Sequence, residues 1–315
     1  MTFAIPKKVL LMSSFVSASR VGAAASAFCL RRLGIETVVL PTTLMGRHPG
    51  WGPPGGGAVP AERLSRMWDA ICQQGITFDA VMTGYMGEAA HAELAADIIK
   101  TVKAGNPDAK ILIDPVMGDN GRLYISAELA ASIKETLIPL ADIITPNLWE
   151  LSHLTDADYD RLRRPSPGNA RSVAAAASAL PSCAACAVLV TSVPFLGPQN
   201  IDQKGNHEKE DDEIGVIFTQ NSQPALRVSH KKFGAVPHGG GDALAATFLA
   251  HWLRGEPPSA CVSKSVGSLF SILTAAAASG AGEMPLISEQ DALFNAEPLP
   301  VQIIPALAKE TSSHE

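Results

Sequence analysis

The stretch PHGGGDALAATFLAHWL, from Pro237 to Leu253, decides how the rest of the sequence is interpreted. Three glycines precede an aspartate and a run of residues that favour a helix. Three glycines in a row are costly to order, because glycine loses more backbone freedom on folding than any other residue. At the N-terminus of a helix they leave unpaired N–H groups accessible, and these groups attract phosphate together with the helix dipole. The stretch therefore predicts a phosphate-binding turn at Gly239, Gly240 and Gly241, with Asp242 beside it as a proton acceptor for an attacking alcohol.

Outward from this stretch, short aliphatic runs alternate with helical patterns. Strands are expected at residues 7–14, 36–44, 79–87, 109–119 and 141–150, and another from Ala225 onward. Helices are expected at residues 23–34, 61–75, 90–105 and 126–138. Buried strands that alternate with helices predict an α/β fold with a mostly parallel sheet covered on both faces. In such sheets ligands bind beyond the carboxyl ends of the strands, so functional residues are expected there.

Composition narrows the classes of protein. The 315 residues are 46% hydrophobic and 5% aromatic, which favours helices packed on aliphatic strands over an all-β sandwich. A net charge of -6 argues against nucleic acid as a partner. The N-terminal apolar run is too short for a signal peptide, and no uninterrupted apolar run reaches about 18 residues. We therefore expect a cytoplasmic protein that does not associate with membranes.

Five scattered cysteines, at positions 29, 72, 183, 186 and 261, do not predict a disulfide framework. Cys183 and Cys186 form a CxxC pair, but a zinc site would need a second such pair. We expect neither redox nor zinc chemistry here.

Two segments interrupt the alternation. Residues 45–60 are dense in glycine and proline and predict a long loop or flap. Residues 202–213 hold six acids against two lysines, a local balance of 2 minus 6, or -4, within a segment at about 198–215. Such a charge run is typical of a solvated hairpin tip.

Polar residues follow two of the predicted strands. Asp114 ends the aliphatic run KILID of one and Asp119 comes after it, while Asn147 and Glu150 come after the run DIIT of another. Each could be an ordinary turn or capping residue. Brought together, they would suit a hydrated Mg²⁺ on a nucleotide phosphate, since this ion takes one or two carboxylates and keeps several waters. The sequence has neither a Walker A motif nor a complete GxGxxG, so P-loop NTPases and dinucleotide-binding dehydrogenases are not indicated.

The segment GGGDALAATFLAHWL resembles the glycine-rich helix signature of the ribokinase superfamily. TGYMG, DPVMGD and ADIITPNLWE together resemble its pyridoxal kinase branch, in the same order along most of the chain. The resemblance implies one domain over residues 1–315, a ribokinase-like three-layer sandwich around a mainly parallel sheet, usually a homodimer. It implies transfer of the γ-phosphate of ATP to the 5'-hydroxyl of pyridoxal, which gives pyridoxal 5'-phosphate in vitamin B6 salvage.

The resemblance also implies roles for individual residues. Asp242 matches the catalytic base, and the three glycines match the anion hole. Asp114 and Glu150 match acids around Mg²⁺ and ATP, and a monovalent cation is a further possibility. The nucleotide site would also include Asn147, Thr191 and Ser192, and the substrate site Ser14, Thr42, His48 and Tyr85.

Three positions depart from the pattern of the branch. Gly240 stands where threonine is usual, Phe15 replaces a histidine after the first strand, and Pro49 replaces a threonine in the flap. The alternatives are a hydroxymethylpyrimidine kinase, in which a cysteine often replaces the aspartate of the signature, and a B6-binding protein with weak or no turnover.

Overall fold

The structure is a computed structural model, and it describes residues 6–180, 186–196, 199–201, 207–209, 213–221 and 223–305. A ten-stranded sheet takes strands from both ends of the chain, in the order β14-β13-β12-β9-β8-β5-β4-β1-β2-β3. The parallel centre consists of β2 (Glu36–Met45), β1 (Lys8–Val16), β4 (Ala80–Thr83), β5 (Lys110–Ile113), β8 (Ile143–Ile144) and β9 (Ala187–Phe195). Antiparallel strands extend it at both edges: β3 (Gly57–Ala58) on one side and β12 (Glu213–Gln220), β13 (Ala225–Lys231) and β14 (Gln302–Ile304) on the other.

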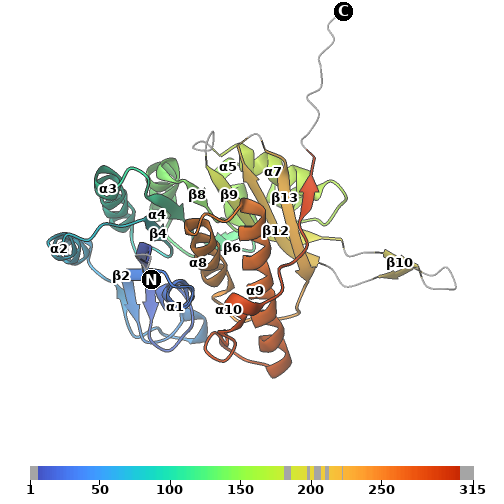
Figure 1. Ribbon diagram of the computed structural model, residues 1–315, viewed down its shortest axis with the longest axis horizontal. Coiled ribbons are helices and arrows are strands. Elements are labelled where there is room, and N and C mark those ends of the chain that lie inside the picture. Colours follow the sequence, from blue (N-terminus) through green and yellow to red (C-terminus); the bar gives the residue numbers. More distant parts are fainter. Residues whose placement is uncertain are drawn as a thin grey trace, which may run out of the picture.

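Helices cover both faces of the sheet (Figure 1). One face carries α2 (Ala61–Cys72), α3 (Ala89–Gly105), α4 (Ala127–Ser132), α5 (Leu148–Thr155), α6 (Tyr159–Leu162) and α7 (Asn169–Ser178). The other carries α1 (Ala23–Arg32), α8 (Gly240–Leu253), α9 (Pro258–Ser279) and α10 (Ala292–Asn295). Side chains alternate along β1, so that Leu10 packs in one core and Leu11 in the other. The predicted three-layer α/β architecture is confirmed.

Several short elements complete the chain. They are the 3₁₀ turns Pro49–Trp51 and Ile138–Leu140, the π turn Ile133–Leu137, the hairpin of β6 (Gly118–Asp119) and β7 (Arg122–Leu123), and the hairpin of β10 (Gln199–Ile201) and β11 (His207–Lys209). The last hairpin belongs to the charged segment; of the tip predicted at residues 202–213, residues 202–206 and 210–212 lie outside the described residues.

The structure corrects several boundaries expected from the sequence: the predicted strands at residues 79–87 and 109–119 shorten to β4 and β5, and two further segments differ. Residues 141–150 do not form one strand: β8 is only Ile143–Ile144, and α5 already begins at Leu148. Asn147 and Glu150 form a reciprocal capping box, and this local pairing starts the helix. The segment 45–60 is not wholly irregular either, because β3 within it pairs with the end of β2.

Among the described residues, one helix is long and apolar enough to cross a membrane, namely α9. Its buried residues, which include Cys261, Val262 and Val266, pack in the core shared with α1 and α8. Cys29, Cys72 and Cys261 are free thiols. Cys186 is disulfide-bonded, which the sequence analysis did not expect, and Cys183 lies outside the described residues.

Candidate active site

The carboxyl ends of the parallel strands meet at one edge of the sheet, and the predicted site residues lie along it. The backbone N–H of Asp114 bonds the carbonyl of Thr83 at 3.2 Å, and Asn147 forms an isolated bridge with Thr191. From β9 to β2, this edge carries Thr191 and Ser192, Asn147, Asp114, Tyr85, Ser14 and Thr42. The fold thus gathers residues from six neighbouring strands, as expected for an open α/β sheet.

The glycine turn opens α8 above this edge. Gly239 has φ of +100°, and a Cβ there would lie 2.1 Å from the carbonyl oxygen of Arg20, so only glycine fits. Gly240 and Gly241 are different, because a Cβ at Gly240 would meet nothing closer than Leu269 at 3.7 Å and one at Gly241 nothing within 4 Å. The N-cap residue, Gly239, has no side chain that could bond the first amides of α8. The first amides of α8 are therefore open to an anion.

Asp242 lies in the first turn of α8, directly after the glycines. Its Oδ2 accepts a hydrogen bond of 2.9 Å from the backbone N–H of Gly22. Burial raises the pKa of Asp242 to about 6, while the bond from Gly22 opposes the rise. The carboxylate is thus ionised at neutral pH but more basic than an exposed aspartate, which suits a proton acceptor.

Gly22 also packs against Ser14 at the end of β1. With φ of +56°, a Cβ on Gly22 would lie 2.3 Å from Ser14 Oγ and 2.5 Å from its carbonyl oxygen. The same glycine therefore contacts Ser14 and binds Asp242. Its backbone sets the position of the carboxylate relative to the first strand.

Glu150 and Asp114 form a buried acidic pair. Glu150 is 2% exposed, and its carboxylate accepts bonds from the amides of Met117 (2.8 Å), Gly118 (3.4 Å) and Asn147 (2.8 Å). Burial raises the pKa of Glu150 to about 7 against these hydrogen bonds. Burial raises the pKa of Asp114 well above its ordinary value, and the charges of Glu150 and Asp242 add to this effect. The charges of two carboxylates therefore act on Asp114 across the site.

The loop that Glu150 holds is strained. Val116, just before Met117, has φ of +41°, a conformation that β-branched residues rarely adopt. This conformation precedes two successive amides that both point at the Glu150 carboxylate. Such strain at a cluster of acids is typical of a functional site.

Tyr124 belongs to the site beside Asp119, and only Asp119 was considered from the sequence, among the acids that would suit Mg²⁺. Desolvation raises the pKa of Tyr124, and the charges of Glu150, Asp114, Asp242 and Asp119 add to this effect, although its side chain is half exposed. The hairpin of β6 and β7 brings it there, since Tyr124 donates its N–H to the carbonyl of Met117 at 3.1 Å. The Asn-Gly pair at 120–121 is a hairpin signal that could have predicted this return.

The flap is anchored at its base. Thr42 donates its hydroxyl to the carbonyl of Tyr85 at 2.6 Å, so this side chain supports the Tyr85 loop. His48 begins a 3₁₀ turn, where its Nδ1 accepts the N–H of Gly50 at 3.1 Å. Its ring stacks on that of His238, with 4.6 Å between the centroids. The flap thus reaches the residue that directly precedes the glycine turn.

Three buried hydroxyls near this edge, those of Ser13, Thr43 and Thr83, have no hydrogen-bond partner within the part of the chain that the structure describes. The hydroxyl of Thr145 interacts with the carboxyl of Asp114 and opposes the rise of its pKa. None of these four residues was predicted from the sequence to have a role. Unpaired buried hydroxyls are costly, and they call for water, an ion or a ligand.

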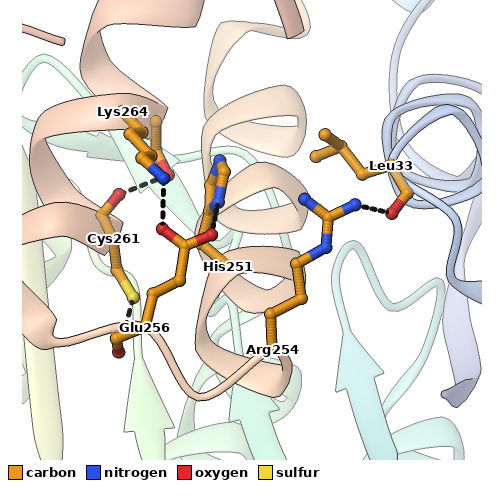
Figure 2. A network of polar contacts seen from close by, with 7 residues as sticks. Leu33, His251, Arg254, Glu256, Cys261 and Lys264 are labelled. Atoms are coloured by element: carbon orange, nitrogen blue, oxygen red, sulfur yellow. Dashed lines mark hydrogen bonds and ion pairs between the residues drawn. The ribbon is translucent and has the colours of Figure 1, made fainter. Parts of the chain in front are cut away.

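The far end of α8 is tied to its neighbours by a polar network (Figure 2). His251 Nδ1 lies 2.8 Å from Glu256 Oε1, and Lys264 of α9 donates to Glu256 Oε2 at 2.7 Å. Arg254 donates to the carbonyl of Leu33 after α1. These bonds hold α8 between α1 and α9, and so support the position of Asp242 at its other end.

The chain belongs to the phosphomethylpyrimidine kinase family, whose model matches residues 55–286. It is 29% identical over 293 residues to pyridoxal kinase PdxY of Leifsonia xyli, covering 91% of this chain and 96% of the relative. It is 30% identical over 288 residues to pyridoxal kinase PdxY of Rubrobacter xylanophilus, covering 90% and 93%.

Solved structures of pyridoxal kinases share the fold. That of Entamoeba histolytica superposes with a TM-score of 0.80 at 24% identity, covering 95% of this chain and 100% of the other. That of Leishmania donovani in complex with ADP and ginkgotoxin gives 0.79 at 23% identity, covering 95% and 100%.

Proposed function

We propose that this protein is an ATP-dependent pyridoxal kinase that forms pyridoxal 5'-phosphate in vitamin B6 salvage. The observation that carries the proposal is the position of Asp242, held by Gly22 in the first turn of α8 beside open backbone amides. The curated relatives named pyridoxal kinase cover most of the chain, which favours this substrate over hydroxymethylpyrimidine.

In this proposal Asp242 accepts the proton of the pyridoxal 5'-hydroxyl as its oxygen attacks the γ-phosphorus of ATP. A bond forms between that oxygen and phosphorus, and the bond from phosphorus to the bridging oxygen of ADP breaks. The amides of the glycine turn stabilise the charge on the transferring phosphoryl group. With Gly240 in place of the usual threonine, backbone N–H groups carry this task without a side-chain hydroxyl.

The two substrates would lie on either side of the glycine turn. We assign the nucleotide to Asn147, Thr191 and Ser192: Asn147 follows β8 and forms a bridge with Thr191, which lies within β9 next to Ser192. We assign pyridoxal to Ser14, Tyr85, His48 and the supporting Thr42. The flap would exclude water, which could otherwise accept the phosphoryl group.

The acids fit a cation. Among the described residues, no group of three or more His, Cys, Asp or Glu side chains is arranged to hold a metal ion. Mg²⁺ on nucleotide phosphates needs only one or two carboxylates and keeps its waters, and Asp114 would supply one. Glu150 already accepts three backbone bonds, so it would act mainly through its charge and by holding the loop at Met117. When bound, Mg²⁺ would neutralise phosphate charge. We infer a monovalent cation as a second occupant from the family resemblance alone.

Two further features are part of the proposal. We infer a cytoplasmic protein, and the free thiols of Cys29, Cys72 and Cys261 support a reducing compartment. We infer a homodimer from the family resemblance, and light scattering of the purified protein tests it.

The deciding experiment measures phosphate transfer from ATP with Mg²⁺ to pyridoxal, pyridoxine, pyridoxamine and hydroxymethylpyrimidine in parallel. Preference for pyridoxal is expected, and Asp242→Ala should lower turnover by roughly 10² to 10⁴. Asp97→Ala, which removes an exposed acid from α3, is the control and should leave turnover unchanged. Transfer to hydroxymethylpyrimidine alone would show that this compound, and not pyridoxal, is the substrate. Pyridoxal binding without phosphate transfer would show that the chain is a binding protein.

A further inference from the structure

The flap and the phosphate-binding turn meet through two histidines. The rings of His48 and His238 are stacked with centroids 4.6 Å apart and an angle of 23° between their planes. His238 directly precedes Gly239, while His48 caps the 3₁₀ turn of the flap. Gly50 within that turn is so close that a Cβ there would lie 3.0 Å from His48 Nδ1 and 3.8 Å from His238 Nε2.

A second contact fixes the same turn from another side. Trp51 closes the 3₁₀ turn, and a Cβ built on Gly282 would lie 2.9 Å from its Cη2. Glu283, the next residue, accepts hydrogen bonds from Ser19 Oγ and the Arg20 amide, both at 2.9 Å. The flap turn therefore rests on the glycine turn and on the loop after α9, next to the backbone that Gly239 approaches.

We propose that His238 is a positioning residue: its ring stacks on that of His48, a contact that we call the clasp, and holds the flap closed over the glycine turn. Protonation of this pair releases the flap. The part of this inference that concerns phosphate transfer rests on the proposed function. The clasp itself does not, because it is a contact between two segments of the free protein.

The geometry requires an uncharged His48. Its Nδ1 accepts the N–H of Gly50 at 3.1 Å, so this nitrogen carries a lone pair and the proton of the neutral ring is on Nε2. A second proton would remove the cap of the 3₁₀ turn. If His238 were also protonated, two cations would face each other at stacking distance, which is repulsive.

The charged groups around His48 also favour its uncharged form. Burial and the neighbouring His238 lower the pKa of His48, and Glu283 opposes them. Arg47 of the flap directs its Nε to the carbonyl of Pro53 at 2.8 Å. At neutral pH the ring is therefore uncharged and the clasp intact.

Hydrogen–deuterium exchange of the free protein at pH 7.5 tests the clasp without any turnover. His238→Ala should speed exchange of the flap amides at residues 50–52 by roughly threefold to tenfold, the range for losing an aromatic pair. His238→Phe keeps a ring for stacking and should restore slow exchange. As a control, His153→Ala removes another stacked histidine, from Trp149 on α5, and should leave flap exchange unchanged. Unchanged flap exchange in His238→Ala would overturn the proposal.

The same measurement at pH 5.5, corrected for intrinsic exchange rates, tests release. The flap of the natural sequence should open more at pH 5.5 than at pH 7.5, and that of His238→Phe should open less, since one of the two charges is missing. Equal pH dependence in both proteins would refute the role of protonation.

A turnover assay separates positioning from structural support. In His238→Ala, the ADP formed per pyridoxal phosphorylated should rise severalfold, because water enters under an open flap, and His238→Phe should reverse it. An unchanged ratio would overturn the positioning role. If pyridoxal is not a substrate at all, the proposed function fails in this assay, while the exchange experiment still decides the clasp.

Discussion

The backbone N–H of Gly22 donates a 2.9 Å hydrogen bond to the carboxylate of Asp242, across 220 positions of the sequence. The same glycine packs on Ser14, where no Cβ would fit. One backbone position therefore sets the site's candidate base relative to the end of the first strand. Both the stability and the activity of the protein should depend on it.

Gly22→Ala should lower the free energy of unfolding by roughly 1–3 kcal/mol, because it adds a Cβ 2.3 Å from Ser14 Oγ to a residue at φ of +56°. Turnover should fall as well, since Asp242 is displaced. Gly105→Ala at the end of α3 is the matched control: a Cβ there meets nothing within 4 Å. Chemical denaturation and initial rates check both, and equal stability of the two variants would contradict the packing argument.

The glycines of the turn should differ in their tolerance of alanine. Gly239→Ala combines φ of +100° with a contact 2.1 Å from the Arg20 carbonyl, so it should distort the turn and lower both melting temperature and turnover. Gly240→Ala has space, with Leu269 at 3.7 Å, and should leave the melting temperature nearly unchanged. Thermal unfolding of the two variants tests this difference. A larger drop in melting temperature in Gly240→Ala than in Gly239→Ala would contradict the argument that only Gly240 has room for a Cβ.

The acidic limb of the pH profile should report Asp242. Its pKa is raised to about 6, and transfer needs the ionised form, so kcat/KM should fall about tenfold per pH unit below about 6. Asp242→Ala should retain little activity and lose this inflection. Rates of phosphate transfer between pH 5 and pH 8 provide the check, and a flat profile in the natural sequence would count against Asp242 as the base.

Asp114→Asn should stabilise the protein while it lowers activity. Burial and the charges of Glu150 and Asp242 raise the pKa of Asp114, so the folded state binds this proton more tightly than the unfolded state does. Its contribution to stability is therefore complete at acidic pH and is lost as pH rises through the raised pKa. The variant should gain about 0.5–2 kcal/mol at pH 8 and little at pH 4. Urea unfolding at both pH values tests this, with Asp69→Asn on the surface of α2 as a control that should show no gain.

Glu256→Ala should destabilise the packing of α8. Burial opposes ionisation of Glu256, but hydrogen bonds from Lys264 and His251 outweigh it and lower its pKa. This contribution is present above the unfolded pKa and disappears as pH falls through the lower folded pKa. A loss of about 1–3 kcal/mol is expected at pH 7, because the partly buried His251 and Lys264 lose their shared acceptor.

The exposed pair of Asp160 and Arg163 provides the comparison for Glu256. Arg163 Nε lies 2.7 Å from Asp160 Oδ1, and both side chains are exposed. Asp160→Ala should therefore have little effect on unfolding. If Glu256→Ala and Asp160→Ala lower the free energy of unfolding by the same amount, the network in Figure 2 does not anchor α8.

The sequence by itself determined the class of fold and the phosphate-binding turn. The aliphatic strands, the helical spacing and the run of glycines before Asp242 are local patterns, and local backbone preferences decide them. The Asn147 and Glu150 capping box and the Asn-Gly hairpin at 120–121 are also local signals. Both signals are present in the sequence but were not used in the predictions. The capping box shortens a predicted strand, and the hairpin brings the chain back so that Tyr124 lies near the carbonyl of Met117.

Only the tertiary structure decided which residues meet. The contacts between Gly22 and Asp242 and between His48 and His238 join segments far apart in the chain. No periodicity encodes such pairs, because they depend on the order of strands in the sheet and on the placement of α8 above it. The raised pKa values of Asp114, Glu150 and Asp242 share one main cause: burial makes the charged form of each carboxyl costly, and neighbouring negative charges add to this for Asp114 and Glu150.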